Sequence, residues 1–149
     1  KRLGLDCITA EVLDGRECKE EFLDGFDLVL ADVPCSGLGI IRKKPDIRYK
    51  DPKPLENLPK VQAAILDNVS RYVRPGGVLL YATCTLLERE NEGVVREFLD
   101  RYKDFTPERF QLPGVFEDAE TGMVTCWPHR HDTDGFFFAK LRRTKDGDI

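Results

Sequence analysis

Methionine is nearly absent from this chain: among 149 residues there is one, Met123, and the chain does not begin with it. We therefore expect the chain to be a piece or a processed product of a longer protein. Long apolar runs are also missing, since no stretch approaches the 18 or so apolar residues that cross a bilayer. The N-terminus lacks an apolar signal core. These absences favour a single globular domain without membrane contact.

The cysteines lack the spacing of a disulfide framework or a zinc ribbon. Their number, five, is odd, and no pair is spaced C-x-x-C. Reduced thiols in the cytoplasm are the simpler prediction. Histidine is scarce as well, and His129 and His131 lie two residues apart near a single cysteine, Cys126. This is weak ligand spacing, so we predict a polar loop there and no metal site.

An overall positive charge is also lacking. The formal net charge is -4, which argues against a protein that coats nucleic acid over its whole surface. Residues 40–53, the basic segment, are the exception, because they include six basic and two acidic side chains. Such a segment could contact a polyanion, and the alternative is a solvated surface loop.

Apolar runs alternate with helical patterns along the chain. The runs predict strands at 7–12, 27–32 and 78–83, and a C-terminal pair at 123–127 and 135–141. One predicted helix begins at Pro59 and is stopped by residues 74–77, and a second has its apolar face within 94–102. The pattern predicts an α/β fold with parallel strands and a terminal antiparallel hairpin.

Reactive side chains follow several of these strands. Asp14, Asp32, Cys35 and Cys84 each come at or just after a predicted strand end, where open α/β sheets bind their ligands. A thiolate is the nucleophile that adds to an electron-poor ring, and a nearby helix N-terminus or cation favours it. The plain alternative is that both cysteines are small buried side chains.

The residues around these cysteines form recognisable motifs. They are Asp-Val-Pro-Cys-Ser-Gly-Leu-Gly at 32–39, Arg-Pro-Gly-Gly at 74–77, Tyr-Ala-Thr-Cys-Thr at 81–85 and Glu-Asn-Glu at 90–92. This set resembles the paired proline-cysteine and threonine-cysteine motifs of RNA cytosine-5 methyltransferases, in particular the RsmB/Sun/Fmu family of small-subunit rRNA enzymes. The resemblance extends from about residue 1 to 143. It implies a Rossmann-like class I methyltransferase fold with S-adenosylmethionine as cofactor.

The resemblance also implies a role for each candidate residue. The thiol of Cys84 is expected to attack C6 of the target cytosine, and Cys35 to assist release of the product. Asp32 is expected to hold the edge of the base near N3 and N4 and also to bind the cofactor, and Asp14 to contact the adenine of S-adenosylmethionine. The basic segment is then expected to contact the RNA backbone through Arg42, Lys43, Lys44 and Arg48.

Parts of the family pattern have no counterpart in this sequence, namely a glycine-rich cofactor loop and an acidic residue after the second strand. We therefore expect residues 1–149 to be a single partial catalytic domain. Alone, it should bind S-adenosylmethionine weakly, lack turnover and self-associate through unpaired strand edges. The RNA could also be a tRNA. Two alternatives without methyl transfer remain: a thiol-redox protein that uses Cys35 and Cys84 as a switch, and an α/β module that only binds RNA.

Overall fold

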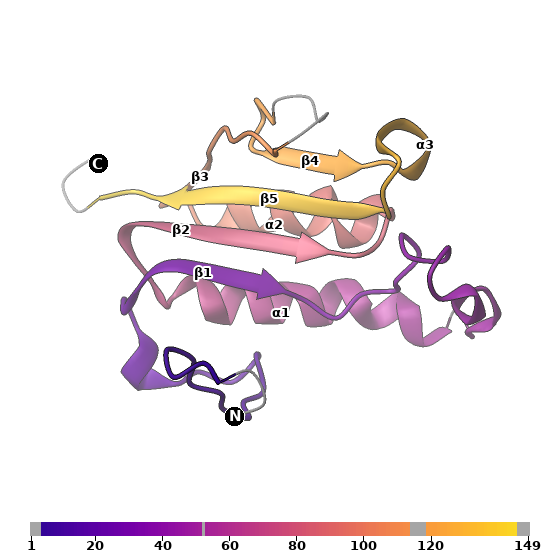
Figure 1. Ribbon diagram of the computed structural model, residues 1–149. Coiled ribbons are helices and arrows are strands. Elements are labelled where there is room, and N and C mark those ends of the chain that lie inside the picture. Colours follow the sequence, from indigo (N-terminus) through magenta and orange to yellow (C-terminus); the bar gives the residue numbers. More distant parts are fainter. Residues whose placement is uncertain (1–3, 52, 114–118, 146–149) are drawn as a thin grey trace.

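The five strands of the described residues form one mixed sheet (Figure 1). The computed structural model describes residues 4–51, 53–113 and 119–145. The strands are β1 (Phe26–Asp32), β2 (Val73–Thr83), β3 (Phe105–Pro107), β4 (Met123–Cys126) and β5 (Phe136–Arg143). Their order is β1-β2-β5-β3, and β4 also pairs with β5. Only β1 and β2 are parallel; the pairs of β5 with β2, β3 and β4 are antiparallel.

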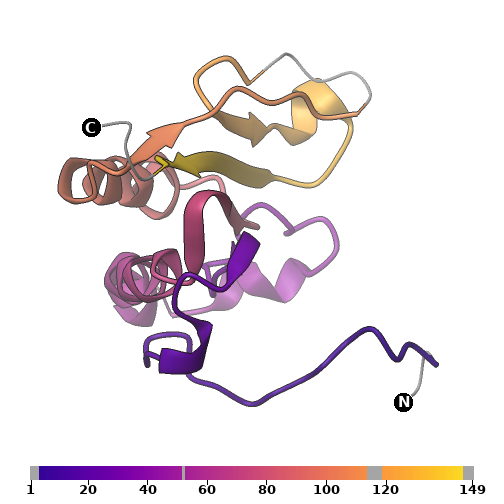
Figure 2. The ribbon, with the colours of Figure 1, turned by 90° about the vertical axis from the view of Figure 1, so that its left-hand side faces the viewer.

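Two helices, α1 (Leu58–Ser70) and α2 (Glu92–Arg101), lie on the same face of the sheet (Figures 1 and 2). The chain passes from β1 to β2 through α1, and such a helical crossover is what parallel pairing requires. The remaining elements are short: η1 (Glu20–Phe22), η2 (Pro45–Tyr49), η3 (Lys53–Asn57), η4 (Glu88–Glu90) and α3 (Pro128–His131). Within the described residues, no helix has the length and apolar character to span a membrane.

The core lies between this sheet face and the two helices. Alternate residues of the strands point toward the helices, so Leu79 and Tyr81 of β2 and Phe137 of β5 are fully buried together with Phe98 of α2. On β1, the side chains that point the other way remain exposed. Leu28 and Leu30 keep 55% and 61% of their surface, so this part of the opposite sheet face is apolar and open.

The predicted fold class is confirmed, with β1 parallel to β2 and a terminal antiparallel pair β4–β5. The predicted strand at 7–12 is wrong, because these residues are exposed and form no strand. A strand needs a neighbour for its backbone groups, and among the described residues β1 pairs only with β2. Residues 74–77, expected to end the helix, lie inside β2. They form an irregularity there, because Phe26 pairs with Val73 while Leu28 pairs with Val78.

Candidate active site

The thiols of Cys35 and Cys84 meet at the C-terminal ends of the two parallel strands. Cys84 directly follows β2, and Cys35 lies three residues beyond the end of β1. Their Sγ atoms are 3.1 Å apart, and the backbone N–H of Cys84 donates to the Cys35 Sγ at 3.3 Å. Both side chains are half-buried free thiols. The expectation that the two cysteines lie at one edge of the sheet is therefore confirmed.

The surroundings of Cys35 favour its protonated form. Burial is the main cause that raises the pKa of its thiol, to about 12, and the hydrogen bond with the Cys84 side chain adds to the rise. A thiol with this pKa keeps its proton at neutral pH and can donate it in a hydrogen bond. The site therefore pairs a proton-bearing thiol at Cys35 with a second thiol at Cys84.

A buried polar network holds the chain around Cys35. The backbone N–H of Ser36 donates to Glu90 Oε2 at 2.9 Å. The Gln62 side-chain amide donates to the same Glu90 oxygen and to the backbone carbonyl of Pro34, both at 3.0 Å. The hydroxyls of Ser36 and Thr85 are 2.7 Å apart. The sequence analysis missed the roles of Glu90 and Gln62, although the Glu-Asn-Glu motif at 90–92 contains the former.

Asp32 lies at the same edge as the thiols. It is the last residue of β1, in register with Ala82 of β2, and it is exposed. Within the described chain its carboxylate makes no ion pair or hydrogen bond, so it is available to a ligand. In contrast, Asp14 is not at the end of a strand. Its carboxylate accepts three hydrogen bonds from Arg16, which lower its pKa to about 2.

The basic side chains of residues 40–53 lie in two different environments: some form ion pairs and others are exposed. Lys43 Nζ lies 2.5 Å from Asp134 Oδ2, and Arg42 lies 3.7 Å from the other oxygen of this buried carboxylate. These two cations therefore attach the segment to the loop before β5. Lys44 and Arg48 are exposed, and neither has an ion-pair partner in the described part of the chain.

The turn after Cys35 approaches two other segments closely. The Gly39 N–H donates to the Cys84 carbonyl at 3.0 Å, and the Gly135 N–H donates to the Gly39 carbonyl at 2.7 Å. A Cβ atom on Gly39 would lie 2.0 Å from the Gly135 carbonyl oxygen. Only glycine fits there, so the turn can join the end of β2 to the start of β5.

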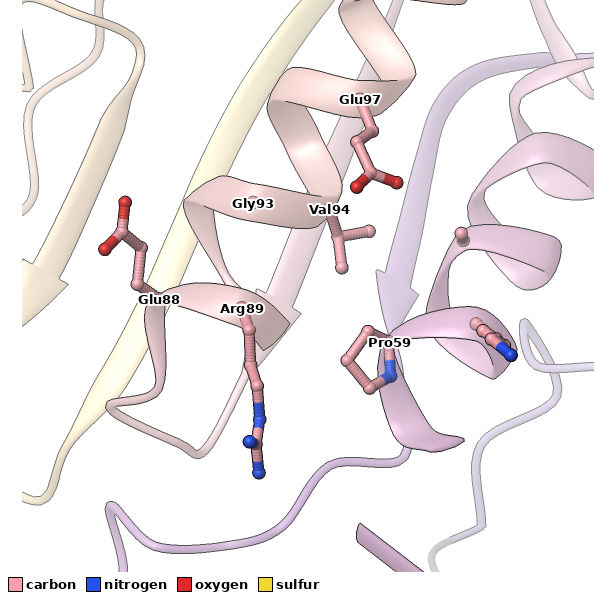
Figure 3. A pocket seen from close by; sticks show the side chains of 8 residues that line it. Pro59, Glu88, Arg89, Gly93, Val94 and Glu97 are labelled. Atoms are coloured by element: carbon pink, nitrogen blue, oxygen red, sulfur yellow. The ribbon is translucent and has the colours of Figure 1, made fainter. Parts of the chain in front are cut away.

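A separate groove of about 530 Å³ runs between α1 and α2 (Figure 3). Its walls include Pro59 at the start of α1, Arg89 in η4 and Glu97 in α2. Neither Cys35 nor Cys84 lines it. Because neither thiol lines the groove, we place the candidate chemistry at the strand ends. In the described residues, no three His, Cys, Asp or Glu side chains group as metal ligands.

Comparison with known proteins identifies the family of this chain. The sequence model of the 16S rRNA methyltransferase RsmB/F family matches residues 1–142. This chain belongs to that family. It is 40% identical over 148 residues to the probable ribosomal RNA small subunit methyltransferase B of Bacillus subtilis, covering 95% of this chain and 33% of that protein. It is 35% identical to the ribosomal RNA small subunit methyltransferase F of Escherichia coli, covering 97% and 31%.

Solved structures agree with the assignment. The crystal structure of PH0851 superposes with a TM-score of 0.86 at 34% identity and covers 95% of this chain and 32% of that one. NSun6 from Pyrococcus horikoshii, solved with SFG, gives a TM-score of 0.74 at 32% identity and covers 97% and 37%. The chain has the Rossmann-like methyltransferase architecture. It spans about a third of the length of these relatives.

S-adenosylmethionine, the methyl donor implied by the resemblance, fits part of the described site. The exposed carboxylate of Asp32 can attract the positive sulfonium of such a ligand. Asp14 is less suited, because both of its carboxylate oxygens already accept from Arg16. A ligand amine at Asp14 would have to displace that guanidinium.

Proposed function

We propose that this chain carries the catalytic thiols of an enzyme that methylates C5 of a cytosine in RNA, with S-adenosylmethionine as the methyl donor. The observation that carries the proposal is the 3.1 Å contact between Cys35 Sγ and Cys84 Sγ at the sheet edge where Asp32 ends β1. The names of the relatives favour small-subunit rRNA over tRNA as the substrate. SFG, an S-adenosylmethionine analogue bound to NSun6, supports the donor. The activity belongs to the whole protein that contains this chain.

The two thiols suit the two halves of this reaction. C5 of cytosine is weakly nucleophilic until a nucleophile adds to C6, and a covalent intermediate divides one hard step into two. The Cys84 thiol loses its proton to a base, its sulfur forms a bond to C6, and the electrons of the C5–C6 double bond shift to C5. Asp32, hydrogen-bonded to the edge of the base, favours this shift. S-adenosylmethionine, when bound, supplies the methyl group to C5.

Release requires the C5 proton to leave to a base and the C6–S bond to break, so that the ring double bond reforms and Cys84 departs as a thiolate. Cys35 retains its proton, because burial raises the pKa of its thiol to about 12. From 3.1 Å it can donate a hydrogen bond to the departing sulfur. A stabilised thiolate leaves faster, and this is the physical basis of a release role for Cys35.

We assign RNA contact chiefly to Lys44 and Arg48, which are exposed beyond the turn that follows Cys35. Phosphates bind such side chains through charge, without reading sequence. Arg42 and Lys43 are already paired with Asp134 and keep the segment in place. We expect the enzyme to act in the cytoplasm, where free thiols stay reduced.

The contact between the sulfurs also suits a dithiol switch, the alternative function. Redox-sensing thiols have a low pKa and are accessible. Cys35 is half-buried and its pKa is raised, which favours the methyltransferase over a switch. An RNA-binding module without catalysis would have no need for two thiols in contact.

The test is methylation of RNA by the whole protein and by its Cys84→Ala variant. Methyl-labelled S-adenosylmethionine and small-subunit rRNA should yield labelled 5-methylcytidine on digestion to nucleosides. Cys84→Ala should yield none, whereas Cys126→Ala, which changes a cysteine outside the pair, should retain the activity. Label in another nucleoside, or full activity of Cys84→Ala, would overturn the proposal. Replacing the rRNA with tRNA in a parallel reaction separates the two substrate classes.

A further inference from the structure

Glu90 is a buried carboxylate to which the family resemblance assigns no role. Its side chain is completely buried in η4. One oxygen accepts from the Ser36 N–H and from Gln62, whereas the other, Oε1, has no hydrogen-bond partner among the described residues. A half-satisfied buried carboxylate costs stability. Its presence therefore points to a purpose other than stability.

The contacts of Glu90 converge on the segment that carries Cys35. Its carboxylate accepts from the residue after this cysteine, while Gln62 binds both the carboxylate and the carbonyl of the residue before it. The main chain is thus held on both sides of the thiol. Glu90 itself is anchored to the sheet, because the Tyr81 hydroxyl of β2 donates to its backbone carbonyl at 2.6 Å.

Cys84 has supports that do not involve the Glu90 carboxylate. It follows β2 directly, and the Asn91 side-chain amide donates to the backbone carbonyl of the next residue, Thr85, at 3.0 Å. Loss of the Glu90 carboxylate would therefore loosen Cys35 and leave the support of Cys84 largely in place. Cys84 also contacts the Cys35 segment, since its carbonyl accepts from the Gly39 N–H and the hydroxyl of Thr85 lies 2.7 Å from that of Ser36, but its place at the end of β2 is set by the strand.

We propose that Glu90 is a positioning residue for the release step: through Ser36 and Gln62 it holds Cys35 against the Cys84 sulfur. The inference rests on the proposed function, in which Cys84 attacks and Cys35 assists release. A displacement of a catalytic group by about 1 Å can cost on the order of 100-fold in rate. The expected defect lies in product release, with attack and methyl transfer preserved.

The test compares Glu90→Ala with Glu90→Gln and Cys35→Ala in the whole protein. Glu90→Ala should accumulate a covalent protein–RNA complex, as Cys35→Ala should. Its methylation rate under multiple-turnover conditions should fall at least about tenfold. Its single-turnover methylation should change little. Glu90→Gln keeps an acceptor oxygen for the Ser36 N–H and should release product normally. Leu141→Ala, which opens a cavity in the core of β5, controls for destabilisation and should accumulate no complex.

A second readout does not depend on catalysis. Diamide accepts two hydrogens from a pair of thiols and leaves a disulfide, so its reaction with Cys35 and Cys84 reports their proximity. Glu90→Ala should slow the formation of this disulfide, measured by peptide mass spectrometry, and Leu141→Ala should not. A Glu90→Ala protein that forms the disulfide at the normal rate and accumulates no complex would overturn the inference. If Cys35→Ala itself accumulates no complex, the proposed role of Cys35 fails, and the disulfide rate alone decides whether Glu90 positions it.

Discussion

At the scale of single residues, the protonated state of Cys35 is the property most open to measurement. Cys7 and Cys18 are exposed thiols, whereas Cys35 is half-buried with a pKa raised to about 12. Because only the thiolate reacts, iodoacetamide at pH 8 should alkylate Cys35 at least about tenfold more slowly than the two exposed cysteines. Raising the pH toward 12 should accelerate Cys35 as its thiolate forms. A peptide mass-spectrometry time course with equal rates for all three at pH 8 would contradict this.

Single residues were predictable where a strand end fixes them. Asp32, Cys35 and Cys84 follow apolar runs that became β1 and β2, so their common edge could be foreseen. Glu90 could not be foreseen, because a glutamate in the charged stretch 88–92 is typical of a solvated surface. Its burial depends on the Ser36 N–H, which arrives from 54 residues away.

At the scale of elements, the turn after Cys35 depends on the absence of a side chain at Gly39. Gly39→Ala would bring a Cβ atom to 2.0 Å from the Gly135 carbonyl oxygen and 2.9 Å from the Cys84 carbonyl oxygen. The backbone must then move, at a cost of about 1–3 kcal/mol of unfolding free energy. Urea unfolding measures this loss, and methylation should fall with it.

Gly15→Ala is the matched control for Gly39→Ala. Its Cβ atom would meet only the flexible Ile65 side chain, at 3.4 Å. The unfolding free energy should therefore change by less than about 1 kcal/mol. Equal losses for the two variants would show that the close approach at Gly39 is unimportant.

Helix α1 shows what periodicity can and cannot predict. The sequence predicts its start within one residue, at Pro59, but not which polar side chain it buries. Gln62 is as fully buried as Leu66. The burial of Gln62 is compensated by hydrogen bonds to Pro34 and Glu90. A hydrophobic pattern does not contain these partners, so it cannot predict that a glutamine lies in the core.

At the scale of the whole molecule, the net charge of -4 on these 149 residues confines the proposed RNA contact to a limited basic surface. Each exposed cation that contacts a phosphate contributes about 0.7 to the slope of log K against log salt for single-stranded RNA. Lys44→Ala and Arg48→Ala should each weaken RNA binding and reduce the slope by about that amount. Arg71→Ala, an exposed cation just after α1 at the other end of the sheet, should leave it unchanged. Fluorescence titration at several salt concentrations measures the slopes, and equal effects of all three variants would contradict the assignment.

The open side of β1 predicts association of the isolated 149 residues. Among the described residues β1 pairs only with β2, and Leu28 and Leu30 are more than half exposed. An unpaired strand edge beside exposed leucines favours contact between copies. Light scattering should detect dimers or larger species, and Leu28→Lys with Leu30→Lys should reduce them. A monomer at high concentration would refute this prediction.

In the proposed reaction, Cys84 forms the bond to the RNA and Cys35 assists its release. RNA with 5-fluorocytidine at the target position tests these two roles. Fluorine replaces the C5 proton whose loss release requires, so the covalent adduct persists. The whole protein, incubated with this RNA and S-adenosylmethionine, would be digested with protease and nuclease and mapped by mass spectrometry. If Cys84 is the nucleophile, the nucleotide will be attached to the peptide that contains Cys84. A nucleotide attached to Cys35 instead would contradict it.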